Sequence, residues 1–91
     1  MTTYAWDLEK NAWLIQERGI SFERAIFLIE KNGLLDTIRH PNQEKYPQQR
    51  MFIVEIDEYA YLVPFVESEE QLFVKTIVPS RKATQKYLGG K

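Results

Sequence analysis

The spacing of apolar residues changes about a third of the way along the chain, and this change restricts the folds open to it. Up to residue 30, apolar residues recur every three or four positions, which is typical of amphipathic helices. From residue 51 onward they form runs rich in β-branched and aromatic side chains, which favour strands. Helices first and strands afterwards predict an α+β fold, with two N-terminal helices packed on a small, mostly antiparallel sheet.

The N-terminal segment predicts a short strand and then a helix. Tyr4-Ala5-Trp6 is a strand candidate whose two aromatic side chains face the same way. Asp7 suits the N-cap of a helix over residues 8–18, because its carboxylate can accept hydrogen bonds from the free amides of the first turn. Gly19 provides the C-terminal stop. Apolar residues recur along this helix at Leu8, Ala12 and Ile15.

A second helix is expected directly after the first. Ser21 is its N-cap, Glu23 lies where the helix dipole favours an acid, and Asn32-Gly33 ends it. Its apolar stripe consists of Phe22, Ala25, Ile26 and Ile29. Because the two helices meet across Gly19-Ile20, they form either an antiparallel hairpin or a tight corner.

The rest of the chain predicts a meander of strands and a last helix. The strand candidates are residues 34–38, 51–56, 59–66 and 72–78, with a polar loop over 40–50. Pro64 lacks an amide hydrogen, so we expect it at a sheet edge or a bulge. Residues 81–88 predict a short helix that ends at Gly89-Gly90. The resulting order is β-α-α-β-β-β-β with a short C-terminal helix, in a single domain over residues 1–91.

The formal net charge of −1 conceals an uneven distribution. Residues 1–70 contain 7 Lys and Arg against 13 Asp and Glu, whereas residues 71–91 contain 5 Lys and Arg and no acid. A basic segment separated from the acids can form a phosphate-binding face. The alternative is a basic C-terminal helix that lies over the protein's own acidic strands.

Several classes of chemistry find little support in the composition. With no Cys and a single His, the sequence predicts neither a metal site nor a cofactor, and it contains no Gly-rich phosphate loop. No apolar run is long enough to cross a membrane, and the N-terminal residues lack the pattern of a signal peptide. We therefore expect a cytoplasmic protein without membrane partners.

Cationic and hydroxylic residues are the remaining candidates for chemistry. They occur in the loop over 39–50 and in the C-terminal segment: Arg39, His40, Lys45, Tyr46, Arg50, Lys75, Ser80, Arg81, Lys82, Thr84, Lys86 and Tyr87. Such residues suit phosphodiester chemistry without a metal, because Lys and Arg stabilise charge on a phosphoryl group while His, Tyr or Lys moves protons. The simpler interpretation is an idle His40 in a loop and a solvated helix face at Lys82 and Lys86.

Three stretches of the chain together resemble a known family. Trp6-Asp7-Leu8-Glu9-Lys10-Asn11 is similar to the opening of the BrnT-like toxins of bacterial type II toxin–antitoxin systems, part of the RelE-like superfamily. Arg18-Gly19-Ile20-Ser21-Phe22-Glu23-Arg24-Ala25 resembles their helix–helix junction, and Ile77-Val78-Pro79-Ser80-Arg81-Lys82-Ala83-Thr84 resembles their closing signature. The resemblance covers residues 4–88 in the same order.

The resemblance implies a RelE-like fold and an endoribonuclease that cleaves RNA without a metal and inhibits growth. It also implies neutralisation by a cognate antitoxin, typically with a ribbon-helix-helix DNA-binding domain, so that operator DNA is contacted only through the antitoxin. We expect the antitoxin to cover the acidic part of the chain and the alternating residues Tyr59, Tyr61, Val63 and Phe65.

Carried over by residue, the resemblance assigns phosphate contact to Arg81, which aligns with the Arg of the closing signature. His40, Lys45 and Arg50 join Arg81 as catalytic candidates, and the RNA-binding candidates are Lys75, Ser80, Lys82 and Lys86. The sequence departs from the family at Thr76, where a basic residue is usual, and at Pro79, where Ser is usual. Two alternatives follow: a toxin-fold binding module or co-repressor that has lost catalysis, and an unrelated α+β adaptor.

Overall fold

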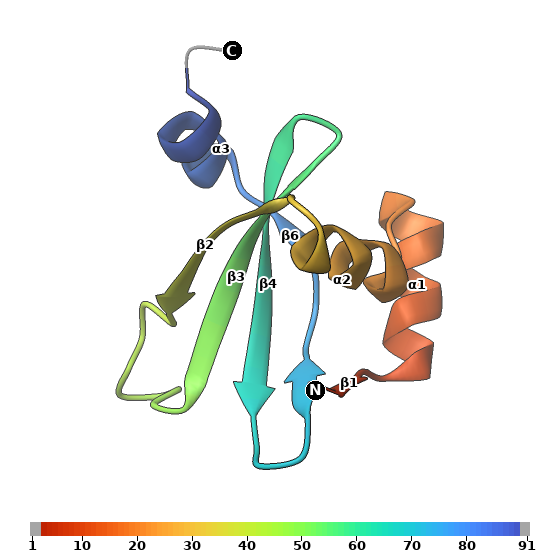
Figure 1. Cartoon of the computed structure of the whole chain (residues 1–91), viewed down its shortest axis with the longest axis vertical. Coiled ribbons are helices and arrows are strands. Elements are labelled where there is room, and N and C mark those ends of the chain that lie inside the picture. Colours follow the sequence, from red (N-terminus) through yellow and green to blue (C-terminus); the bar gives the residue numbers. More distant parts are fainter. Residues whose placement is uncertain (1–2, 90–91) are drawn as a thin grey trace.

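Three helices and a mixed sheet of six strands make up the protein, in a computed structural model that describes residues 3–89 (Figure 1). The elements in order are β1 (Tyr4–Ala5), α1 (Leu8–Arg18), α2 (Phe22–Glu30), β2 (Leu34–Arg39), β3 (Gln49–Ile56), β4 (Tyr59–Glu67), β5 (Leu72–Val74), β6 (Val78–Pro79) and α3 (Arg81–Leu88). The predicted α+β class and the predicted order are confirmed. Gly90, expected to help end the last helix, lies outside the described residues. Within residues 3–89, no helix is long and apolar enough to span a membrane.

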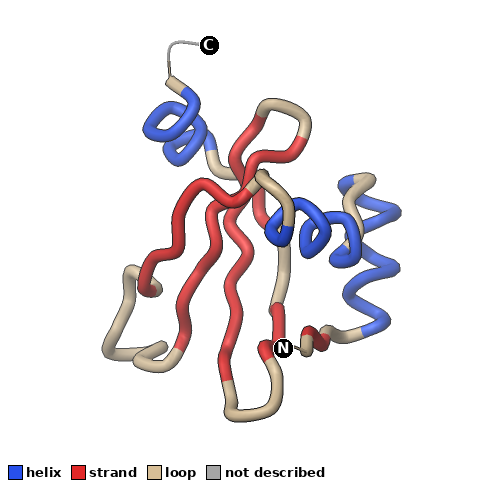
Figure 2. The backbone as a smooth tube through the Cα atoms, viewed as in Figure 1, coloured by secondary structure: helices blue, strands red, loops and turns tan. Residues whose placement is uncertain are grey.

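The strands lie in the order β1-β5-β4-β3-β2, and β6 also pairs with β4 (Figure 2). The pairing of β1 with β5 is parallel, and all other pairings are antiparallel. β2 therefore forms one edge of the sheet and the two-residue β1 forms the other.

The prediction of one continuous strand over residues 72–78 is wrong, because the strand is interrupted between β5 and β6. The register pairs Phe65 with Val74 and Leu62 with Val78, so the three residues 75–77 lie opposite only two residues of β4. One of those two is Pro64, which has no N–H with which to continue the ladder. Its position opposite this irregularity confirms the bulge alternative.

The two faces of the sheet are covered by different helices. The larger core lies under α1 and α2, where the apolar face of α2 meets buried side chains of β3 and β4 such as Phe52 and Phe65. This confirms the predicted apolar stripe of α2. The opposite face carries a smaller core in which Ala83 and Leu88 of α3 pack against Ile53 and Ala60. Figure 1 shows α1 and α2 meeting at a corner rather than running side by side.

The predicted apolar stripe of α1 does not face the core. Leu8 and Ile15 are 77% and 51% exposed, and Ala12 is also exposed, while the buried residues of this helix are Asn11 and Leu14. Asn11 can be buried because its amide has hydrogen-bond partners on α2. The predicted ends are confirmed: Asp7 accepts from the amides of Glu9 and Lys10, and Gly19 adopts the left-handed conformation with φ 68°.

The proposed antitoxin-facing surface at Tyr59, Tyr61, Val63 and Phe65 is wrong for two of its four residues. Val63 and Phe65 are fully buried in the core beneath the helices. Tyr59 and Tyr61 are half-buried, and their rings form an edge-to-face pair with 5.8 Å between the ring centres. Their alternation reflects packing on the core face of β4.

Candidate nucleic-acid interface

α3 is attached to β4 through a set of hydrogen bonds at its first turn. The Ser80 hydroxyl is the N-cap and accepts from the amide of Ala83 at 3.0 Å. The amide of Ser80 donates to the carbonyl oxygen of Ala60 at 3.0 Å. The Thr84 hydroxyl accepts from the amide of Ala60 at 2.9 Å and donates to the carbonyl oxygen of Ser80 at 2.8 Å. These bonds fix the start of α3 on the sheet.

A groove of about 240 Å³ lies between α3 and the sheet. Its floor is apolar and comes from three neighbouring strands, through residues such as Ile38, Met51 and Leu62. Its full lining is Ile38, Pro41, Met51, Ile53, Leu62, Ser80, Lys82, Ala83, Lys86 and Tyr87. Three of the four predicted RNA-binding residues, Ser80, Lys82 and Lys86, therefore lie on one groove.

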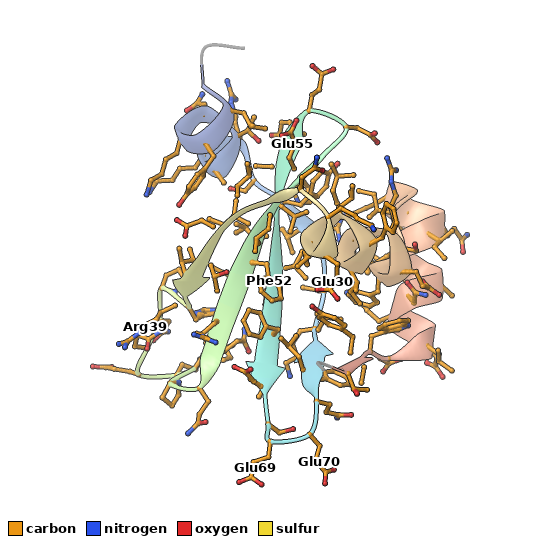
Figure 3. The ribbon with its side chains drawn as sticks, viewed as in Figure 1. Glu30, Arg39, Phe52, Glu55, Glu69 and Glu70 are labelled. Carbon is orange, nitrogen blue, oxygen red and sulfur yellow. The ribbon has the colours of Figure 1, made fainter. Side chains whose placement is uncertain are left out.

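In the described part of the chain, the cations of α3 form no salt bridge with the protein's own acids. The ion pairs among residues 3–89 are Arg24–Asp57 and Arg50–Glu67, and neither involves α3. Figure 3 shows Glu69 and Glu70 at the tip of the turn between β4 and β5, far from α3. Support for the interpretation of α3 as a basic helix lying over acidic strands comes from one place, Asp36 on β2, which accepts a hydrogen bond from Tyr87 and is attracted by the charge of Lys86.

The Tyr87–Asp36 contact joins the last turn of α3 to the edge strand β2. The Tyr87 hydroxyl donates to Oδ2 of Asp36 at 2.6 Å. This hydrogen bond is the main cause that lowers the pKa of Asp36 from its ordinary value, and the amide of Thr37 and the positive charge of Lys86 add to the effect. The same bond is the main cause that raises the pKa of Tyr87. Both shifts favour the pair of a carboxylate with a neutral phenol.

The N-terminal turn of α3 differs from those of the other two helices in its charge. α1 and α2 carry Glu9 and Glu23 in their first turns, where an acid complements the positive end of the helix dipole. α3 has no acid in its first turn and begins instead with Arg81 and Lys82, both exposed. Two cations at the positive end of a helix repel the dipole, and a bound anion relieves that repulsion.

Arg81 lies at the start of α3 but is not among the residues that line the groove. At 100° per residue it projects from the helix on a different side from Lys82 and Lys86, which lie one turn apart. Arg81 and Lys82 therefore leave the same first turn in different directions, and Lys86 continues the side of Lys82 one turn further along.

His40 and Lys45 lie in the loop between β2 and β3, where both stabilise the local structure. The amide of His40 donates to Gln49 at 3.0 Å, and its Nδ1 accepts from the amide of Asn42 at 3.0 Å. The His40 ring packs against Tyr46, with 4.4 Å between the ring centres, and the ammonium of Lys45 lies 5.3 Å from the Tyr46 ring centre. The loop reaches the groove only through Pro41.

Arg50 lies on the face of the sheet opposite to α3. Its register partner on β4 is Phe65, which belongs to the core under α1 and α2, and its guanidinium lies 5.5 Å from that ring centre. It also pairs with Glu67 at 3.0 Å. Lys75 is exposed in the interruption between β5 and β6, where its amide donates to the carbonyl oxygen of Pro64 at 2.8 Å.

The structure thus gathers Ser80, Lys82 and Lys86 on one groove beside Arg81, and it does not gather the four catalytic candidates at one place. Such an arrangement can bind the phosphates of a polyanion next to an apolar surface. Among residues 3–89, no three His, Cys, Asp or Glu side chains lie together in a way that could hold a metal ion.

Two structurally important residues were not anticipated from the sequence. Asp36 was not expected as the partner of Tyr87, because the two residues are 51 positions apart and no local pattern relates them. Arg18 was not expected to reach the interruption in the sheet, where its guanidinium donates to the carbonyl oxygen of Ile77 at 2.9 Å. Pro64 predicted an irregularity in the sheet, but the sequence did not indicate that Arg18 would form a hydrogen bond there.

In comparisons with protein-family models, with curated proteins and with solved structures, no significant match to this chain was found.

Proposed function

We propose that this chain is a BrnT-like toxin of a type II toxin–antitoxin system, a cytoplasmic protein that binds RNA along α3 and cleaves it without a metal. The observation that carries the proposal is the first turn of α3, which presents Arg81 and Lys82 at the positive end of the helix with no acid to neutralise them. A phosphate group is the ligand that such a site favours. Lys86 and the groove extend the site along the helix.

The three stretches that carry the family resemblance contact one another in the structure, so they form one connected part of the fold. Asn11 from the first stretch contacts the amide of Phe22 from the second at 2.8 Å. Arg18 from the second stretch contacts the carbonyl oxygen of Ile77 from the third at 2.9 Å. These two hydrogen bonds link α1 to α2 and α1 to the segment before β6.

A second candidate is a toxin-fold module that has lost catalysis and acts as a binding module or co-repressor together with a small DNA-binding partner. One observation favours it: the catalytic candidates are separated, with Arg50 paired to Glu67 on the far face of the sheet and the Nδ1 of His40 engaged by Asn42. Cleavage under the first proposal then depends on Arg81 and on groups that approach it when RNA binds.

Incubation of the purified protein with single-stranded RNA in the presence of EDTA separates the two candidates. The toxin proposal predicts cleavage that persists in EDTA, because attack by a ribose 2′-hydroxyl needs charge stabilisation and proton transfer rather than a metal. Binding without cleavage at high protein concentration supports the second candidate. If the protein neither binds nor cleaves RNA, the first candidate is contradicted, and tight co-purification with a small DNA-binding protein then separates the second candidate from the unrelated adaptor.

A further inference from the structure

β2 is the long open edge of the sheet, and the direction of its amides can be assigned from the register. The amide of His40, directly after β2, donates inward to Gln49 of β3. Successive residues of a strand point their N–H and C=O groups to alternate sides, so Ile38 and Asp36 also face β3. Thr37 and Arg39 therefore direct their N–H groups outward. An outward row of this kind is a template for another strand.

The outward amide of Thr37 is already occupied. It donates to Oδ1 of Asp36, the preceding residue, at 2.7 Å. The second carboxylate oxygen of Asp36 accepts from the Tyr87 hydroxyl at 2.6 Å, so α3 holds the carboxylate in place from the neighbouring layer. The two carboxylate oxygens of Asp36 therefore accept one hydrogen bond from the sheet edge and one from α3.

We propose that Asp36 blocks the outer edge of β2 against pairing with the same strand of a second copy of this chain, and that Tyr87 holds Asp36 in the blocking position. The function is separate from RNA binding. The block acts at the Thr37 amide, which lies in the middle of the regular part of β2. This regular part begins after the shift in register between Leu34 and Asp36.

A second copy is the partner that fits this edge best. Two β2 strands placed antiparallel around Thr37 would exchange both N–H···O bonds at Thr37, as a two-fold interface requires. The same register places Asp36 opposite Ile38 and Arg39 opposite Leu35, so no like charges face each other. The carboxylate on the Thr37 amide opposes this pairing, because it occupies the N–H that the two-fold pair requires.

The test compares Asp36→Ala with Asp36→Asn by sedimentation velocity and by hydrogen exchange of the Thr37 amide. Wild type should be monomeric and its Thr37 amide protected, although it faces away from β3. Asp36→Ala should expose that amide, raise its exchange rate about tenfold or more at low protein concentration, and shift the protein to dimers as the concentration rises. Asp36→Asn keeps an acceptor oxygen and should remain monomeric.

A rescue variant shows whether the Thr37 amide is responsible. Thr37→Pro removes the N–H at an outward edge position that tolerates proline, so Asp36→Ala with Thr37→Pro should be monomeric again. Tyr87→Phe should give weaker association than Asp36→Ala, because Asp36 keeps its bond to Thr37. Dimers that persist in the double variant, or an unprotected Thr37 amide in wild type, would overturn the proposal. The wild-type exchange measurement can overturn the proposal even if a variant does not fold.

Discussion

The side-chain oxygen of Asn11 accepts a hydrogen bond from the backbone N–H of Phe22, with 2.8 Å between the two atoms. Phe22 is the first residue of α2, so its N–H has no partner within that helix. The Asn11 amide nitrogen also donates to Glu23 at 2.8 Å. One buried side chain on α1 therefore caps α2, and it replaces the apolar contact that the sequence pattern of α1 had led us to expect.

Asn11→Ala should lower the free energy of unfolding by about 1–3 kcal/mol, because it leaves the buried amide of Phe22 without a partner. Asn11→Asp keeps an acceptor for the Phe22 amide, so this loss of stability is avoided. It instead places a second carboxylate beside Glu23, which is unfavourable. Urea unfolding measures both changes. Gln16→Ala, at an exposed position of the same helix, is the matched control and should change stability by less than about 0.5 kcal/mol. Equal stability of Asn11→Ala and wild type would contradict the role given to Asn11.

The Tyr87–Asp36 pair should make stability depend on pH at both extremes. The pKa of Asp36 is lowered in the folded protein, so its contribution is present above the unfolded value of about 3.9 and is lost as pH falls through the lowered value. The pKa of Tyr87 is raised, so its contribution is present below about 10 and is lost as pH rises through the raised value.

Comparison of wild type with Tyr87→Phe isolates this effect from other titrating groups such as Glu23, whose pKa is also lowered. The advantage of wild type in urea unfolding should be largest between about pH 5 and 9 and should shrink below pH 4 and above pH 10. An advantage that stays constant across the whole range would show that the hydrogen bond does not govern the two pKa values.

Charge reversal at the two ends of α3 should change stability in opposite directions. Arg81→Glu replaces a cation by an acid at the positive end of the helix and should stabilise the protein by about 0.5–1 kcal/mol. Lys86→Glu removes a cation from the last turn, where it is favourable, and should destabilise by a similar amount. Thermal unfolding at low salt measures both. A gain in stability at Arg81 together with weaker RNA binding indicates that the cation is kept for function.

Lys82 and Lys86 should each account for one phosphate contact. The double variant Lys82→Ala/Lys86→Ala should bind single-stranded RNA more weakly and should reduce the slope of log affinity against log salt by about 1.4, or about 0.7 for each contact. Lys31→Ala, at an exposed position after α2, is the control and should leave the slope unchanged. Fluorescence anisotropy at several salt concentrations provides the data. An unchanged slope in the double variant would show that the groove lysines do not contact the RNA phosphates.

The parts of the fold that sequence predicted best are those determined by local patterns. The caps at Asp7, Ser21 and Gly19 depend on side chains and turns that lie within a few residues, so they were predictable. The apolar stripe of α2 is buried because it is the most continuous one in the helical region. In α1 the visible stripe at Leu8 and Ile15 faces outward, since the helix is positioned by Asn11 and Leu14.

Contacts between distant residues determine what the sequence pattern missed. The alternation in β4 correctly placed Tyr59, Tyr61, Val63 and Phe65 on the same face of the strand. It did not indicate that the helices would bury Val63 and Phe65. The gathering of Lys82 and Lys86 with Met51 depends on how α3 crosses the sheet, which the composition of the C-terminal segment does not specify. The separation of Arg50 from Arg81 has the same cause, because strand pairing decides the face on which Arg50 lies.

Growth and RNA integrity after induced expression test the central claim, that this chain is an RNA-cleaving toxin acting through the first turn of α3. Wild type should arrest growth with fragmented RNA, and co-expression of the adjacent open reading frame should relieve both effects. Arg81→Ala should accumulate as folded protein while RNA cleavage falls by about 10²–10³, the loss expected when one charge-stabilising group is removed. Unimpaired growth and intact RNA at the same level of soluble wild-type protein would contradict the claim.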